Sequence, residues 1–407
     1  MFWYIILTLL LLSIMVVIHE LGHFLFAKLF GVKVLEFSVG MGPALFTTKK
    51  KKTKTGSNFE LSEQYKYNEE SNDTPNDNSI SDDTVINESE NLSVENVSDD
   101  EKTAFSIRAL PIGGYVSMLG EDGNSDDDRA YCNKKPWQKI IISFAGPAMN
   151  IILGILCMCL LVGLDAWQGG LLASNTVAEF VTEVQNTEGE IVDFNSTSDK
   201  CEHPLMVGDK IIKVDGVSVH TGNEVVYEVS HKAHEPIDLV VIRNGERIVL
   251  DDVIFPTYES QGVVFGEIDF KVYGEKPSAS NILKHAFFRS FSTVKMVVDS
   301  IVDMFSGRYG IESVSGPVGV ATVVEEAASA GFYSLLYLFT FITMNLGIFN
   351  LLPFPALDGG HLVFHFYELI FRKPVKKEFE QTVNLIGIMI LMAFAFFITC
   401  KDILNLF

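Results

Sequence analysis

Cysteine and basic residues are scarce in this sequence, and both shortages narrow the classes of protein that it can represent. Five of its 407 residues are cysteine, and none of them forms a C-x-x-C pair. The sequence therefore predicts neither a disulfide framework nor a cysteine zinc site. Lysine and arginine total 31 against 52 aspartate and glutamate, a formal net charge of −21, which argues against nucleic acid as a partner.

Charge is missing altogether from long stretches. Residues 1–18 contain no charged side chain, and 48% of all residues are hydrophobic. Four runs, at 2–26, 140–164, within 327–357 and at 381–400, are apolar over enough residues to cross a hydrocarbon core about 30 Å thick. No basic segment precedes the first run and no small-residue cleavage site follows it, so we expect a membrane span there and not a cleaved signal peptide. The predicted fold class is a polytopic α-helical membrane protein with four transmembrane helices.

Clusters of lysine and arginine between the runs predict how the chain crosses the membrane. They occur at 49–54, 134–139 and 372–377. Because such clusters stay on the cytoplasmic side, the N-terminus, the segment 166–326 and the C-terminus are expected outside.

The first run ends in a short pattern of two histidines and a glutamate. His19-Glu20-Leu21-Gly22-His23 has the H-E-x-x-H spacing. On a helix, His19 and His23 lie one turn apart on one face, where both imidazoles can bind Zn²⁺, and Glu20 is placed to activate a water molecule. The alternative is a pair of hydrogen-bonded core histidines. A central charge costs about 2.5–3.5 kcal/mol to bury in a membrane span, which weakens that alternative.

A third metal ligand is expected at Asp358. Pro353 and Pro355 interrupt the third run and Gly359-Gly360 permits a sharp turn, so Asp358 lies on irregular backbone that membrane depth tolerates only around a buried cavity. The alternative is that Asp358 caps a helix at the headgroups. The predicted topology places Asp358 and the histidines in the same, cytoplasmic half of the bilayer, which a shared metal requires.

Three motifs together carry a family resemblance. The H-E-x-x-H, the Asn-x-x-Pro-x-Pro-x-Leu-Asp-Gly-Gly segment at 350–360 and Gly-Pro-Ala-Met-Asn at 146–150 resemble the site-2 protease family, and most closely its bacterial regulator-of-sigma-E protease branch. The resemblance implies intramembrane zinc proteolysis, with His19, His23 and Asp358 as ligands and Glu20 as general base. It also implies that Asn350 steadies the substrate or the oxyanion.

The resemblance implies substrates and a location as well. The substrates would be single-span membrane proteins already trimmed by an upstream site-1-type protease, such as anti-sigma factors, or remnant signal peptides. The protein would lie in the bacterial cytoplasmic membrane, in contact with the lipid bilayer.

Two further segments extend this prediction. Residues 168–272 contain strand-turn-strand patterns with Asp-Gly and Asn-Gly turns, and G-D-x-I-x-x-V-x-G at 208–216 resembles the core of a PDZ domain. We expect one extracytoplasmic PDZ-like α+β domain, which either binds peptide or acts as a size filter. Residues 37–46 and 105–118 resemble the halves of a membrane-associated β-hairpin, whose edge at Gly113, Gly114 and Tyr115 could bind substrate; an ordinary surface hairpin is the alternative.

Several assignments stay open. Asn150 either makes a packing hydrogen bond or acts near the active site. His361 and His365 are interpreted as structural or supporting residues. A non-catalytic membrane adaptor and a multispan zinc protease with a glutamate ligand are the rival functions; the complete ligand set argues against the first and Asp358 against the second.

The predicted domains follow from these patterns. They are a first transmembrane helix with the first hairpin strand (1–48), a disordered acidic insertion (49–101), a second hairpin strand and cytoplasmic loop (102–136), a second transmembrane helix (137–166), the PDZ-like domain (168–272), an amphipathic interfacial segment (278–326), a third transmembrane helix (327–371) and a fourth (380–403).

Overall fold

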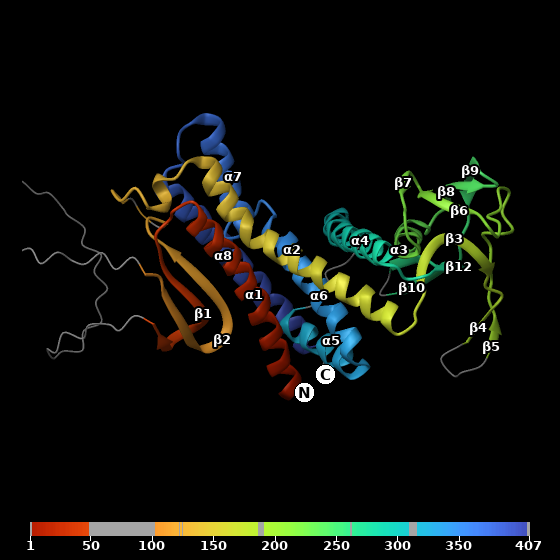
Figure 1. Ribbon diagram of the computed structural model, residues 1–407, viewed down its shortest axis with the longest axis horizontal. Helices are drawn as coiled ribbons and strands as arrows, with labels where there is room; N and C mark the ends of the chain where they lie inside the picture. The colour runs from red at the N-terminus through yellow and green to blue at the C-terminus, as the bar shows by residue number, and fades with distance from the viewer. Residues whose placement is uncertain are drawn as a thin grey trace, which may run out of the picture.

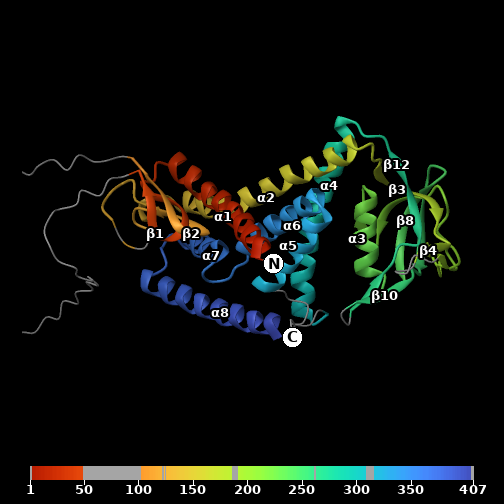
Figure 2. The same ribbon diagram turned by 90° about the horizontal axis from the view of Figure 1, so that it is seen from below.

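The computed structural model describes residues 2–48, 102–121, 123, 125–185, 191–260, 263–308 and 316–404. The insertion predicted at 49–101 lies outside the described residues. Figure 1 shows an elongated molecule with a β-hairpin at one end, a β-sheet domain at the other and long helices between them. Figure 2, turned by 90°, keeps the hairpin and the domain at opposite ends.

Four helices in the described part of the chain are long and apolar enough to cross a membrane, as the sequence predicts. They are α1 (Phe2–Leu29), α2 (Pro136–Trp167), α6 (Phe332–Asn350) and α8 (Lys377–Leu404). Glycines allow the first three to approach closely, since small residues bring membrane helices together. A Cβ added at Gly22 would lie 2.3 Å from Ala145 O, and one added at Gly154 would lie 2.4 Å from Met344 Cγ. Helix α2 therefore packs against both α1 and α6.

Two of the predicted segments are divided between helices. The segment 278–326 holds α4 (Ala279–Ser306) and most of α5 (Pro317–Ala330), and 327–371 holds α6 and α7 (Asp358–Phe371). Pro353 and Pro355 lie between α6 and α7, because proline lacks the backbone N–H that a helix interior requires. The break places Asp358 at the first residue of α7.

The two hairpin halves pair as predicted. Strand β1 (Val34–Thr47) runs antiparallel to β2 (Ala104–Met118), with Phe37 opposite Val116. Buried apolar side chains of the two strands, including Val34, Phe37 and Met118, pack with Ala27 of α1. A short 3₁₀ helix, η1 (Tyr131–Asn133), then leads to α2. The hairpin is thus fixed beside the helix that carries the two histidines.

In its described residues, the β-sheet domain consists of a six-stranded sheet, two two-stranded sheets (β4-β5 and β10-β11) and one helix, α3 (Gly222–Lys232). The strand order is β12-β3-β6-β8-β9, with β7 paired to β6. The strands of the domain are β3 (Leu172–Phe180), β4 (Glu183–Gln185), β5 (Ile191–Asp193), β6 (Lys210–Val214), β7 (Val217–Ser218), β8 (Ile237–Arg243), β9 (Glu246–Val253), β10 (Thr257–Ser260), β11 (Val263–Gly266) and β12 (Phe270–Glu275).

Both predicted turns of this domain are present. Asp215-Gly216 joins β6 to β7 and Asn244-Gly245 joins β8 to β9, and all four residues have positive φ angles, as tight hairpin turns of this kind require. The core between sheet and helix is apolar, with Val177, Ile211, Val214, Val225, Val229, Leu239 and Val241 among its buried members.

A buried carboxylate of the domain is paired with a partly exposed arginine. Asp209 is fully buried, and Arg243 donates to both of its carboxylate oxygens, from Nε at 2.7 Å and from Nη2 at 2.8 Å. The hydrogen bonds to Asp209 raise the pKa of Arg243. The Asp of the G-D-x-I pattern thus fixes the loop that precedes β6, since Met206 N also donates to it.

Polar contacts attach the domain to α4. Tyr227 Oη of α3 donates to Asp299 Oδ2 at 2.7 Å, and His231 Nε2 lies 2.8 Å from Asp303 Oδ2. Other residues of α4 are apolar and exposed, namely Leu283, Phe287, Phe291, Val298, Val302 and Phe305. Helix α4 is therefore amphipathic, with a polar side bound to the domain.

Candidate metal centre

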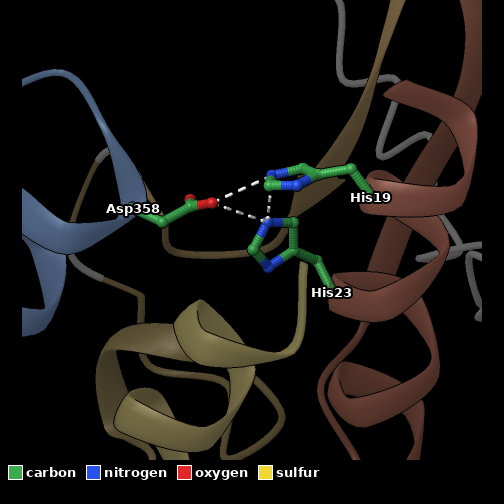
Figure 3. Close-up of side chains that lie close together, drawn as sticks. All are labelled: His19, His23 and Asp358. Carbon is green, nitrogen blue, oxygen red and sulfur yellow. Dashed lines mark hydrogen bonds and ion pairs between the residues drawn. The ribbon is translucent and has the colours of Figure 1, made fainter. Parts of the chain in front are cut away.

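Three side chains of types that commonly bind metals meet between α1 and α7. Among the residues that the structure describes, His19, His23 and Asp358 form a group whose ligand atoms all lie within 4.8 Å of one another. Figure 3 shows the two imidazoles and the carboxylate pointing toward a common centre. His19 Nε2 lies 2.9 Å and His23 Nε2 lies 3.4 Å from Asp358 Oδ2, and the two Nε2 atoms are 3.3 Å apart.

Local geometry explains the histidine pair, and the helix break explains the aspartate. His19 and His23 are one turn apart in α1, so their side chains leave the helix on the same face. Asp358 follows an irregular stretch in which Ala356 has a φ of 72°, a left-handed conformation uncommon for a residue other than glycine. This stretch turns the chain so that α7 begins facing α1.

The spacing of the three ligand atoms fits zinc. Ligand atoms about 2.0–2.2 Å from a tetrahedral zinc ion lie roughly 3.3–3.6 Å from one another. Two of the three observed separations, 3.3 and 3.4 Å, fall in that range, and the third, 2.9 Å, is a little shorter. Two imidazole nitrogens and one carboxylate oxygen are also a donor set typical of a catalytic zinc site, which leaves the fourth position open.

Hydrogen bonding around His23 also fits a cation. His23 Nδ1 lies 2.8 Å from the backbone oxygen of Ile142, which can only accept, so Nδ1 carries a proton. In a neutral imidazole, Nε2 then offers a lone pair toward Asp358 Oδ2, a buried oxygen that accepts no hydrogen bond. Lone pairs that converge in this way repel one another unless a positive charge lies between them.

Gly146 of α2 provides the space beneath the histidines. A Cβ at this position would lie 2.3 Å from His23 Nε2 and 2.8 Å from His19 Nε2, closer than carbon and nitrogen atoms pack. The sequence indicates only that Gly146 suits close helix packing. Its position against both imidazoles could not be read from the sequence, because it depends on how α2 crosses α1.

Glu20 lies on the wall of a cavity that opens beside these residues. The cavity has a volume of about 1380 Å³ and is lined by His19, Glu20, His23, Tyr115 and Asp358, among others. Strand β2 passes next to the glutamate, since a Cβ at Gly114 would lie 3.7 Å from Glu20 Cγ. Glu20 therefore faces the same space as the three candidate ligands.

The other residues singled out from the sequence are more dispersed. Tyr115 lines the cavity, whereas Gly113, Gly114 and Asn350 are not among the described residues of its wall. Asn350 is the last residue of α6. Their substrate-binding roles stay predictions.

His361 and His365 reach the cavity but bind other partners. His361 Nδ1 lies 3.2 Å from Glu380 Oε1, and His365 Nε2 lies 2.7 Å from Tyr131 Oη. No motif in the sequence pointed to Tyr131 or Glu380. Tyr131 and His365 are 234 residues apart in the chain, so no local pattern could have connected them.

Comparison with known proteins identifies the family. The model of Peptidase family M50 matches residues 7–60 and 93–394. The chain belongs to this family, which confirms the resemblance to site-2 proteases drawn from the three motifs.

Relatives match along nearly their whole length. A Clostridium acetobutylicum protein named as a zinc metalloprotease is 31% identical over 402 residues, which cover 99% of this chain and 98% of that protein. A Fusobacterium nucleatum protein named in the same way is 29% identical, with 98% and 97% covered. The zinc metalloprotease RasP of Shouchella clausii is 27% identical, with 97% of each chain covered.

Proposed function

We propose that the protein is an intramembrane zinc protease that hydrolyses peptide bonds within or near the transmembrane segments of single-span membrane proteins. The observation that carries the proposal is the convergence of His19, His23 and Asp358 beside Glu20 in a chain whose described part has four helices long and apolar enough to cross a membrane. Membership in Peptidase family M50 supports the reaction class.

We assign each residue of the site a role. His19, His23 and Asp358 hold Zn²⁺, and Glu20 is the general base. When bound, zinc acts as a Lewis acid that polarises a water molecule and the scissile carbonyl. Glu20 accepts the proton of the attacking water and returns it to the leaving amine. Asn350 steadies the substrate or the oxyanion in this proposal.

The cavity supports hydrolysis at membrane depth because it can hold water. Its wall carries polar and charged side chains from several elements, and ion pairs there join Lys139 to Glu368 and His361 to Glu380. Such groups are costly in contact with lipid but stable around water. The wall formed by α7 and the start of α8 thus offers water a route to Glu20.

The β-hairpin is proposed as the surface that holds an unwound substrate. Gly113, Gly114 and Tyr115 lie on β2, and Tyr115 reaches the cavity. A substrate strand could add to the hairpin edge through backbone hydrogen bonds, which would expose its peptide carbonyls to the site. We regard the hairpin as membrane-associated for this reason.

We place the termini and the β-sheet domain outside the bacterial cytoplasmic membrane. The two termini lie close together in both views (Figures 1 and 2), which agrees with four crossings, since an even number of crossings leaves both ends of the chain on one side of the membrane. The domain is proposed to be PDZ-like, on the basis of its G-D-x-I-x-x-V-x-G segment and its buried Asp209. The exposed apolar residues of α4 would rest on the external surface of the cytoplasmic membrane.

We expect the domain to select substrates and not to take part in the reaction. The reason is the distance between the domain and the candidate metal centre. The hairpin passes next to Glu20, and the domain and the hairpin lie at opposite ends of the molecule (Figure 1). The substrates it admits would be single-span proteins already shortened outside by an upstream protease, as in regulated intramembrane proteolysis. Anti-sigma factors and remnant signal peptides are of this kind.

Excision of the domain tests this role. Leu172 pairs with Glu275 across β3 and β12, so a short Gly/Ser linker can replace 172–275 without stretching the chain. Cleavage of a substrate that retains its bulky external domain should rise, and cleavage of a pre-trimmed peptide should stay within a few-fold of the intact enzyme. A shortened enzyme that folds, binds zinc and no longer cuts the pre-trimmed peptide would refute the screening role.

The proposed function itself is tested with the purified chain in detergent. We expect one zinc per chain by elemental analysis, and cleavage of a model transmembrane peptide that stops with a chelator and returns with added zinc. Zinc binding without cleavage would favour the rival function, a membrane adaptor. Cleavage of soluble chains in preference to the membrane peptide would favour the other type of multispan zinc protease.

A further inference from the structure

Asn150 of α2 lies against the far side of His19. It is one turn beyond Gly146 on the same helix, and its side chain is fully buried. Its amide contacts His19 Nδ1 at 3.2 Å through the nitrogen, Nδ2. The amide oxygen then has no hydrogen-bond partner. A buried oxygen without a partner is costly, so this orientation of the amide is unfavourable.

The chemistry of a metal ligand favours the opposite orientation. If His19 Nε2 faces a cation, its lone pair is used there, and the ring proton must be on Nδ1. Nδ1 is then a donor and cannot accept from another N–H group. Amide oxygen and nitrogen are nearly indistinguishable by shape, so turning the amide by 180° places Oδ1 where it accepts the Nδ1 proton.

We infer that Asn150 is a positioning residue for the metal centre: its side-chain oxygen accepts the Nδ1 proton of His19 and so fixes the tautomer and ring orientation that present Nε2 to zinc. This rests on the proposed function, in which His19 is a zinc ligand. Partners of this kind are general in zinc sites, where the second nitrogen of a histidine ligand donates to an oxygen acceptor.

The two histidines are supported in different ways. His23 Nδ1 contacts a backbone oxygen, that of Ile142, which no substitution removes. His19 Nδ1 contacts a side chain, and only this support can be deleted by mutation. A substitution at Asn150 therefore tests the tautomer of His19 without replacing any of the proposed metal ligands.

Packing shields the native amide of Asn150 from water. Helix α6 approaches Asn150 through Gly347, where an added Cβ would lie 3.3 Å from Asn150 Cβ and 2.9 Å from Pro147 O. The side chain is thus enclosed between α1 and α6 with no exposed surface. Loss of its oxygen should leave the Nδ1 proton of His19 without an acceptor.

The experiment measures zinc affinity in a background that cannot turn over. Glu20→Gln is combined with Asn150→Leu, Asn150→Ala, Asn150→Asp or, as a matched control, Asn345→Leu. Asn345 is also an asparagine in a membrane helix with a buried amide oxygen that lacks a partner, but among the described residues it is hydrogen-bonded to neither His19 nor His23. Zinc dissociation constants come from competition with a chromophoric chelator, and the absorption spectrum of the cobalt-loaded protein reports the ligand geometry.

We expect Asn150→Leu and Asn150→Ala to weaken zinc binding by about 10–100-fold and to alter the cobalt spectrum. Asn150→Asp keeps an oxygen acceptor, so its affinity should stay close to that of the Glu20→Gln parent, as should that of Asn345→Leu. Two variants remove the acceptor, so the comparison survives if the leucine variant fails to fold.

Two results overturn the inference in distinguishable ways. Equal zinc affinity in the parent and in a folded Asn150→Ala or Asn150→Leu protein means that Asn150 only packs, and the proposed function stands. Absence of zinc from both the wild-type protein and the Glu20→Gln parent means that the proposed metal site is wrong, and the role of Asn150 fails with it.

Discussion

Replacing Glu20 by glutamine is expected to stop peptide hydrolysis while zinc remains bound. Replacing Asp358 by asparagine should abolish both zinc binding and hydrolysis. Glu20 lines the cavity and, among the described residues, is not a member of the ligand group, so glutamine at this position should keep the site but could not accept a proton as the proposed base does. Loss of a general base typically costs 10²–10⁴-fold in rate. Asp358→Asn exchanges a charged ligand for a neutral amide, which binds Zn²⁺ poorly.

Zinc content and turnover of a model membrane peptide, measured on both variants in detergent, separate the two roles. Full zinc occupancy together with near-normal cleavage in Asp358→Asn would eliminate Asp358 as the third ligand. His361 would be the next candidate by sequence, although its Nδ1 is already paired with Glu380. Loss of zinc in Glu20→Gln would instead make Glu20 part of the ligand set.

Gly146→Ala is expected to be as damaging as removal of a ligand, although it adds a single methyl group. The new Cβ would lie 2.3 Å from His23 Nε2, so either the ring or the whole of α2 must move. Overpacking of this kind typically costs about 1–3 kcal/mol, and here it falls on the two atoms that would bind the metal. We expect zinc affinity to fall at least 100-fold and cleavage to become undetectable.

The matched control is Gly163→Ala, which lies in the same helix with nothing within 4 Å of the added Cβ. This change should leave zinc binding and cleavage intact, and alanine should favour the helix by about 0.5–1 kcal/mol. Zinc affinity and thermal unfolding of both variants are the measurements that distinguish these outcomes. A Gly146→Ala protein with normal zinc affinity would mean that α2 lies farther from the histidines than the 2.3 Å approach of the added Cβ implies.

Many elements of the fold could be predicted because the sequence patterns that indicate them are local. Runs of uncharged residues predict the four spans. The Asp215-Gly216 and Asn244-Gly245 pairs predict the turns of the hairpins in the domain. The division of 327–371 into two helices follows from Pro353 and Pro355 in principle. The sequence could not give the exact ends of α6 and α7, because the backbone between them is held by tertiary contacts, such as the hydrogen bond from Ala356 N to Asn384 Oδ1 of α8.

The candidate site likewise has features that the local sequence predicts and features that depend on tertiary packing. The sequence alone determined that His19 and His23 share a face, since a spacing of four residues on a helix allows no other arrangement. It also predicted Asp358 as the third ligand and left Asn150 with two alternative roles, without showing that either residue approaches His19. Only the tertiary structure decided that Asp358 meets the histidines, that Gly146 makes room for them and that Asn150 contacts His19 Nδ1. The physical reason is that periodicity fixes directions within one element, whereas a metal site depends on how α1, α2 and α7 pack, and that packing is set by contacts between residues more than a hundred positions apart.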